Sequence, residues 1–263
     1  MNFSRPTTGL LALCLPFALL HLATNTAPRT ATTGPCVVAH WRFQNGVKGT
    51  AAGPAQLIVD SSGNDQHGIA CGSPCFERVD LPSSNLALLF RGGDDRIFVP
   101  DDAVFRLTGS LTLEAYVRVD RYPVCAARQS QIVMRGDDRP GFDPWFLAIH
   151  ESGQLLFWVA NGLNEGTCVA SPEPIPLGTL VHVAGTLHAE TGEQSLWLNG
   201  ERVATTQTSV RSAGALGGPG AGIGIGNLQS GGDQGFRGLI DEVRISAEAL
   251  TPDRFLAPPR ASR

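Results

Sequence analysis

Lysine is almost absent from the chain, and so are long runs of residues that favour helices. Lys48 is the single lysine among 20 basic residues, whereas glycine (31) and proline (18) are frequent. This composition argues against a mainly helical protein and favours many short strands joined by tight turns. A net charge of -4 gives no basic surface for nucleic acid or for an anionic membrane. We therefore expect neither of them as a partner.

The motifs that mark common catalytic sites are missing too. The chain has no Gly-x-Ser-x-Gly, no His-Glu-x-x-His and no phosphate-binding Gly-rich loop. The stretch GLIDEVRIS at 238–246 holds two adjacent acids, Asp241 and Glu242. A glycosidase needs two carboxyl groups that face one sugar, whereas neighbours in a strand point to opposite faces. We therefore predict that the protein is not an enzyme.

The apolar run at 10–22 is too short to span a bilayer comfortably. It follows Arg5, and its length is typical of the core of an export signal. We predict a signal peptide at 1–23, a flexible lead-in at 24–35 that is rich in Thr, Ala and Pro, and a mature protein without a membrane segment. That protein would be secreted or held in the cell envelope. An N-terminal anchor that is never cleaved is the alternative.

Removal of the signal leaves five cysteines: Cys36, Cys71, Cys75, Cys125 and Cys168. In an oxidising compartment we expect two disulfides and one free thiol. Cys71 and Cys75 are close enough to close a local loop, and Cys125 and Cys168 lie in predicted loops that a bridge would join. The spacing does not fix the pairing. It also argues against zinc, because Cys71 and Cys75 have no second pair at a suitable distance.

From residue 37 onward, apolar and polar residues alternate with the period of a strand. Residues 110–120 (SLTLEAYVRVD) show this most clearly. Turns are predicted at 151–153 (ESG), at 189–194 (AETGEQ) and at Asn199-Gly200, which favours a two-residue hairpin.

The only convincing helix begins near Thr251, a possible cap, and ends before Pro258. No linker or repeat divides residues 36–257. We therefore predict an all-β domain, built as a sandwich of two antiparallel sheets with one short C-terminal helix, and a tail at 258–263.

Four motifs occur in a characteristic order: HWRFQNG at 40–46, DSSGNDQHG at 60–68, LLFRGGDDRIFVP at 88–100 and FRGLIDEVRIS at 236–246. Their succession resembles the bacterial laminin G-like domain of the concanavalin A-like lectin/glucanase superfamily, over nearly all of 36–257. The resemblance implies a jelly roll in which the N-terminal strand lies near the C-terminal one. The glucanase relatives carry their acids as Glu-x-Asp-x-x-Glu, which this chain lacks. The fold also hosts lectins and adhesion modules, so the resemblance does not name a ligand.

The alternation within 238–246 places Asp241 among apolar side chains, where an unpaired carboxylate costs several kcal/mol. Glu242 and Arg244 lie on the opposite face, where we expect an ordinary surface ion pair. Asp241 then needs a cation or several N–H donors to neutralise it.

Residues 60–68 carry short oxygen-bearing side chains around a glycine. Such residues suit a hydrogen-bonded turn, and they also suit Ca²⁺, which takes six to eight oxygen ligands. Related jelly rolls often carry a structural calcium ion, so the resemblance adds to this possibility. We predict a calcium site formed by Asp60, Asn64 and Asp241, with a metal-free turn as the alternative.

A sugar site would need aromatic side chains beside hydrogen-bonding groups. The chain offers Tyr116, Trp145, His150, Trp158, His182 and Trp197. Aromatic residues in strands are more often part of the core, but we predict Trp145, Tyr116 and His182 as ligand contacts. The predicted function is a secreted binding or adhesion module for carbohydrate or a cell-surface protein. The alternatives are an envelope domain without a sugar site and, third, a glycoside hydrolase or lyase.

Overall fold

The computed structural model describes residues 37–82, 84–217 and 221–257. The predicted signal peptide, the lead-in, Cys36 and the tail at 258–263 lie outside these described residues. Within the described ranges, no helix is long and apolar enough to cross a membrane.

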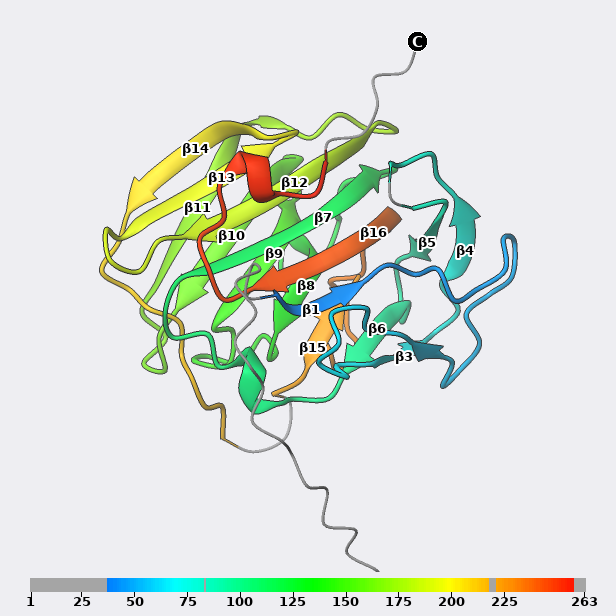
Figure 1. The fold of residues 1–263 in the computed structure, drawn as a ribbon, viewed down its shortest axis with the longest axis horizontal. Coiled ribbons are helices and arrows are strands. Elements are labelled where there is room, and N and C mark those ends of the chain that lie inside the picture. Colours follow the sequence, from blue (N-terminus) through cyan, green and yellow to red (C-terminus); the bar gives the residue numbers. More distant parts are fainter. Residues whose placement is uncertain (1–36, 83, 218–220, 258–263) are drawn as a thin grey trace, which may run out of the picture. The chain divides into compact units, whose positions relative to one another are not determined.

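Sheet A is an antiparallel sheet of eight strands, with the order β14-β13-β12-β7-β16-β5-β4 and with β1 paired to β16. The last strand that the structure describes, β16, therefore lies in the middle of the sheet (Figure 1). Its pairing with β1 confirms that the two ends of the domain meet. The strands are β1 (Val37–Trp41), β4 (Cys75–Arg78), β5 (Leu86–Arg91), β7 (Leu111–Val119), β12 (Leu180–Leu187), β13 (Glu193–Leu198), β14 (Glu201–Gln207) and β16 (Arg237–Ser246).

Sheet B is a second antiparallel sheet of eight strands, in the order β11-β10-β9-β8-β15-β6-β3-β2. Its strands are β2 (Leu57–Ile58), β3 (Gly68–Cys71), β6 (Arg96–Val99), β8 (Gln129–Arg135), β9 (Trp145–His150), β10 (Gln154–Ala160), β11 (Gly166–Pro174) and β15 (Ile223–Ile225).

The two sheets bury one main core between them. Alternate residues of β7 point into it (Leu111, Leu113, Ala115, Val117 and Val119), and β9 contributes Trp145, Leu147 and Ile149 from the opposite sheet. The period-two pattern of both strands is therefore explained by one buried face each. This confirms the predicted all-β sandwich of two antiparallel sheets.

The predicted turns are confirmed at two hairpins. Residues 151–153 connect β9 to β10, and Asn199-Gly200 connects β13 to β14. Asn199 and Gly200 have φ angles of 51° and 84°, as a two-residue hairpin with positive φ at both positions requires.

The predicted C-terminal helix is reduced to one 3₁₀ turn, η2 (Pro252–Arg254), and the Thr251 side chain makes no capping hydrogen bond. The backbone becomes extended at Phe255, so the turn ends after three residues and does not continue into a regular helix. A second 3₁₀ turn, η1 (Ala103–Phe105), follows β6 and was not predicted.

Candidate functional site

The outer face of sheet A is covered by the C-terminal segment, residues 247–257. Leu250 and Phe255 pack on outward side chains of β12 and β13. The hydroxyl of Thr112 donates to the carbonyl of Glu248 (2.6 Å) and accepts from the N–H of Leu250 (2.9 Å). Figure 1 shows the red segment crossing this sheet. Polar residues that alternation directs outward from β7 are therefore inside the protein.

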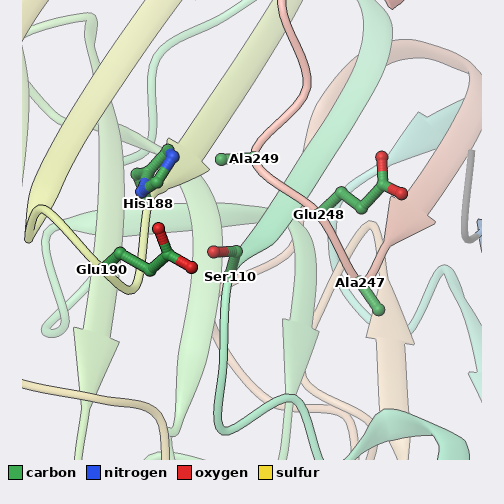
Figure 2. Close-up of a pocket in the computed structure, with 6 residues that line it drawn as sticks. All are labelled: Ser110, His188, Glu190, Ala247, Glu248 and Ala249. Carbon is green, nitrogen blue, oxygen red and sulfur yellow. The ribbon is translucent and has the colours of Figure 1, made fainter.

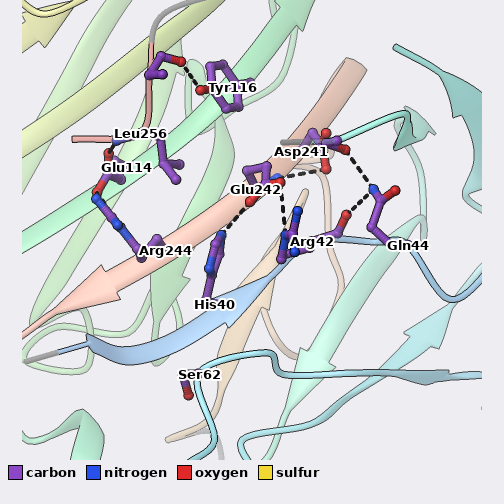
Figure 3. A network of polar contacts seen from close by, with 12 residues as sticks. His40, Arg42, Gln44, Ser62, Glu114, Tyr116, Asp241, Glu242, Arg244 and Leu256 are labelled. Atoms are coloured by element: carbon purple, nitrogen blue, oxygen red, sulfur yellow. Dashed lines mark hydrogen bonds and ion pairs between the residues drawn. The ribbon is translucent and has the colours of Figure 1, made fainter. Parts of the chain in front are cut away.

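Glu114 is the centre of a buried ionic network beneath this segment (Figure 3). Its carboxylate accepts from Arg244 Nε (2.7 Å) and from the backbone N–H of Leu256 (2.9 Å), and lies 2.9 Å from His182 Nε2. Burial alone would raise the pKa of Glu114, but the hydrogen bond from His182 and the charge of Arg244 bring that pKa below its usual value. The carboxylate is therefore charged and ties β7, β12 and β16 to the C-terminal segment.

The three residues predicted as ligand contacts are all buried. Tyr116 and His182 have no exposed area and lie ring against ring, with centroids 5.6 Å apart. The Tyr116 hydroxyl donates to the carbonyl of Ala257, so the C-terminal segment covers it. Trp145 belongs to the main core because its place in β9 directs it between the sheets. None of the three presents a face to solvent, so the structure does not support a ligand-binding surface at these positions.

Strand β16 departs from regular alternation at Asp241 and Glu242. Its register with β7 shifts between Asp241 and Arg244, and Glu242 has a φ angle of 50°, which marks a β-bulge. Both carboxylates are completely buried. The predicted surface pair of Glu242 with Arg244 is therefore wrong. Glu242 lies 2.6 Å from His40 Nε2 and 3.1 Å from Arg42 Nε (Figure 3).

A proton can neutralise the buried carboxylate of Asp241. Its Oδ1 accepts the N–H of Glu242 (2.8 Å), and its Oδ2 has no hydrogen-bond partner among the described residues. Burial raises the pKa of Asp241 to about 8; the charge of Glu242 adds to the rise, and the nearby Ser84 side chain and the N–H of Glu242 oppose it. The carboxyl group is therefore mostly protonated at neutral pH, which removes the cost of an unpaired buried charge.

Asp60 forms the hydrogen-bonded turn that was the alternative to calcium. Its Oδ1 accepts the N–H groups of His40 (2.8 Å) and Ser62 (2.9 Å). Its Oδ2 accepts the Ser62 hydroxyl (2.7 Å) and the N–H of Gln66 (3.0 Å). Four donors therefore surround the two oxygens that a calcium ion would need.

The other two predicted calcium ligands also have different roles. Asn64 directs its side-chain N–H groups at the carbonyls of Val37 and Val38, and Asp241 bonds within β16. Among the residues that the structure describes, no group of three or more His, Cys, Asp or Glu side chains is placed to hold a metal ion. The residues at 60–68 fit the metal-free turn, and calcium binding stays a prediction.

The structure joins none of the described cysteines in a disulfide, and Cys71, Cys75, Cys125 and Cys168 are free thiols in it. Disulfides therefore stay a prediction. Cys71 lies in β3 of sheet B and Cys75 in β4 of sheet A, so the short segment between them crosses from one sheet to the other. Cys168 lies within the edge strand β11 rather than in the predicted loop.

An open hollow of about 380 Å³ lies at one end of the sandwich (Figure 2), lined by Ser110, His188, Glu190, Ala247, Glu248 and Ala249. The Ser110 hydroxyl accepts the N–H of Ala189 (2.9 Å), and Glu248 pairs with Arg254 (2.6 Å). The hydrogen bonds among the described residues include none between Ser110 and His188. The hollow therefore lacks the nucleophile–base contact that a serine hydrolase requires.

Trp158 is half-buried on the outer face of sheet B and is not among the predicted contacts. Its ring is parallel to that of Phe146, with centroids 6.0 Å apart and an interplanar angle of 15°. Its indole N–H donates to the carbonyl of Asp143 (2.9 Å). The alternation of β10 already carries this signal, because the core residues Leu155 and Phe157 leave Trp158 on the other face.

Comparison with known proteins agrees with this fold. Residues 91–254 match the laminin G-like family described as the concanavalin A-like lectin/glucanases superfamily. The chain belongs to this superfamily. The laminin G-like domain is also 35% identical to mouse (Mus musculus) pentraxin-related protein PTX3 over 71 residues, which are 27% of this chain and 18% of that protein.

Solved structures show the same architecture. Domain 4 of AbnA, an extracellular arabinanase from Geobacillus stearothermophilus in complex with arabinotriose, is 21% identical and has a TM-score of 0.59, covering 84% of this chain and 97% of that one. The receptor-binding domain of a botulinum neurotoxin C/D mosaic is 12% identical with a TM-score of 0.59, covering 83% of this chain and 49% of that one. A Trypanosoma rangeli sialidase is 16% identical with a TM-score of 0.53, covering 83% and 31%. At these identities the likeness concerns the fold alone.

Proposed function

We propose that this laminin G-like domain is a non-catalytic module that binds carbohydrate. The observation that carries the proposal is the combination of membership in a lectin and glucanase superfamily over residues 91–254 with the burial of the acids in its central strands. A member of such a family without accessible paired acids is suited to binding rather than to hydrolysis.

Glycoside hydrolysis needs two carboxyl groups that flank an accessible sugar. Glu114, Asp241 and Glu242 have no exposed area. Glu114 and Glu242 are held in ion pairs with basic side chains, and Asp241 lies inside the β16 bulge. These acids are therefore structural, and the third alternative, a hydrolase or lyase, receives no support from them.

The solved neighbours favour sugar as the ligand class. One is an arabinanase domain in complex with arabinotriose, and another is a botulinum neurotoxin binding domain in complex with SialylT. Their different ligands on one fold fit the view that the sugar is chosen by local side chains rather than by the architecture. We accordingly propose an oligosaccharide as the partner, with a cell-surface protein as the second candidate.

We also propose that the protein works outside the cytoplasm. The apolar run at 10–22 behind Arg5 has the form of an export signal, and a binding module for polysaccharide or cell-surface glycan would meet its ligand there. Fractionation of cells that express the full chain tests this. Protein that stays in the cytoplasm with the predicted signal peptide still attached would contradict this proposal.

A glycan array probed with the purified protein tests the binding function. We expect saturable binding to a subset of oligosaccharides, without release of reducing ends during prolonged incubation. Binding to no glycan by folded protein would overturn the carbohydrate proposal and favour a protein-interaction domain. Hydrolysis of a bound polysaccharide would overturn the non-catalytic assignment.

A further inference from the structure

One row of side chains crosses the outer face of sheet B near its β11 edge. Cys168 of β11 pairs with Trp158 of β10, which pairs with Phe146 of β9. In the next row Ala170 pairs with Leu156. Cys168 and Ala170 are exposed, Trp158 and Leu156 are half-buried, and Phe146 is almost completely buried between its neighbours. The open part of this face is called the Trp158 strip: Trp158, Leu156, Cys168 and Ala170.

The indole of Trp158 is fixed in place. Phe146 stacks beside it, and its N–H is held by the carbonyl of Asp143. A Cβ atom on Gly166 would lie 2.1 Å from the indole, so the ring occupies the space that a side chain would take at that position. A ring held in this way loses little conformational freedom when a ligand stacks on it.

Two loops lie at the Trp158 end of β9 and β10 and supply hydrogen-bonding groups. The loop before β9 and the loop after β10 are joined where the N–H of Gly141 donates to Asn164 Oδ1 (2.9 Å). Asn161 donates to Glu165 Oε2 (2.8 Å) in the second loop. An apolar ring beside such polar loops matches the needs of a sugar, which has an apolar face of C–H groups and a rim of hydroxyl groups.

The lack of charged side chains on the strands around the strip favours a neutral ligand over an acidic one. The outward positions of the three strands β9 to β11, up to the shift in register after Ala170, carry Phe146, Ala148, His150, Gln154, Leu156, Trp158, Cys168 and Ala170. This set contains no Asp, Glu, Lys or Arg. These strand positions therefore offer nothing to pair with the carboxylate, sulfate or phosphate of an acidic ligand. In the adjoining loops Arg139 is paired with Asp137. The carboxyl groups of Asp143 and Glu165 disfavour an acidic ligand, so the site fits an uncharged one best.

We propose that the Trp158 strip binds a neutral oligosaccharide, with one sugar ring stacked on the indole and the chain continuing over Leu156 and Ala170. The inference rests on the proposed carbohydrate-binding function and assigns it a site. The indole face, which is electron-rich, attracts the C–H groups of the sugar. The site lies on the sheet opposite to the one where Tyr116 and His182 are buried.

Calorimetric titration with arabinotriose and cellotriose, and with sialyllactose as a charged comparison, tests the site. We expect a neutral glycan to bind the wild type. Trp158→Ala should weaken that binding by about tenfold or more, as loss of a central aromatic anchor does. Because Trp158→Ala also removes packing, Ala170→Glu serves as a second variant, adding charge at an exposed position of the strip. We expect Ala170→Glu to weaken binding of the neutral glycan as well.

The matched control is Gln207→Glu, which adds the same charge at an exposed position of β14, the edge strand of sheet A. Its binding should equal that of the wild type. Equal binding by wild type, Trp158→Ala and Ala170→Glu would overturn the site while leaving the proposed function intact. Binding confined to sialyllactose would overturn the neutral ligand class. Failure of the wild type to bind any glycan would overturn the proposed function itself.

Discussion

Replacement of Asp241 by asparagine should stabilise the protein at neutral pH and change it little in acid. In the folded protein, burial raises the pKa of Asp241 to about 8, against an ordinary value of 3.8. The unfolded carboxyl group ionises above 3.8, whereas the folded one keeps its proton. Each pH unit between 3.8 and 7 therefore costs about 1.4 kcal/mol of folding free energy, or about 4 kcal/mol in total at pH 7.

The direction of this effect follows from proton uptake. Below pH 3.8 both states are protonated, and Asp241 contributes no pH dependence. Between pH 3.8 and 8 the folded state binds more protons than the unfolded state, so stability falls as pH rises. Asparagine does not titrate. The free energy of unfolding of Asp241→Asn minus that of the wild type should therefore increase from pH 4 to pH 8 and then level off.

Urea denaturation followed by tryptophan fluorescence between pH 3 and pH 9 measures this difference. Glu242→Gln is the matched control, because the hydrogen bond from His40 and the charges of His40 and Arg42 lower the pKa of Glu242 despite its burial. Its wild-type contribution is present at neutral pH and lost in acid, so this variant should be destabilised most at neutral pH. A pH-independent difference for Asp241→Asn, or slopes of the same sign for both variants, would refute the reasoning.

Three further predictions concern packing, metal and thiols. Gly224→Ala should destabilise the fold by roughly 2 kcal/mol or more, because its Cβ would lie 2.2 Å from the carbonyl oxygen of Asn227, whereas Gly162→Ala meets nothing within 4 Å and should be neutral in the same urea titration. Calcium should leave the melting temperature unchanged in scanning calorimetry, since the turn at Asp60 is already filled by donors; a rise that a chelator reverses would restore the predicted metal site. Burial raises the pKa of the Cys168 thiol to about 11, so a thiol reagent should modify it slowly in the native protein at pH 7 and faster as the pH rises; denatured protein that shows no reactive thiol would contradict the free cysteines.

Local sequence patterns predicted much of the sandwich. The alternation in 110–120 identified the inward face of β7, because a strand between two sheets has one face in the core. Asn199-Gly200 identified a hairpin, because few other pairs accept positive φ angles at both positions. The pairing of β1 with β16 came from the family resemblance and not from these local signals.

The buried acids of sheet A were harder to predict, because one of their features depends on a distant part of the chain and another on a local irregularity of β16. Alternation separates the two faces of β7, but it does not show that residues 247–257 return to cover Glu114 and Tyr116. The bulge at Glu242 likewise breaks the alternation that was used to assign Asp241 and Glu242 to opposite faces. A single extra residue is enough to invert such an assignment.

The central place of β16 in sheet A has a consequence for how the chain folds. Before residues 237–246 are synthesised, the strands on its two sides, β7 with β12 to β14 and β5 with β4, have no partner between them. A nascent or truncated chain would therefore expose the open edges of β7 and β5, which are templates for pairing with other chains. Sheet A can close only after residues 237–246 have left the ribosome. Its folding is then dominated by contacts far apart in sequence and should be slow for its size.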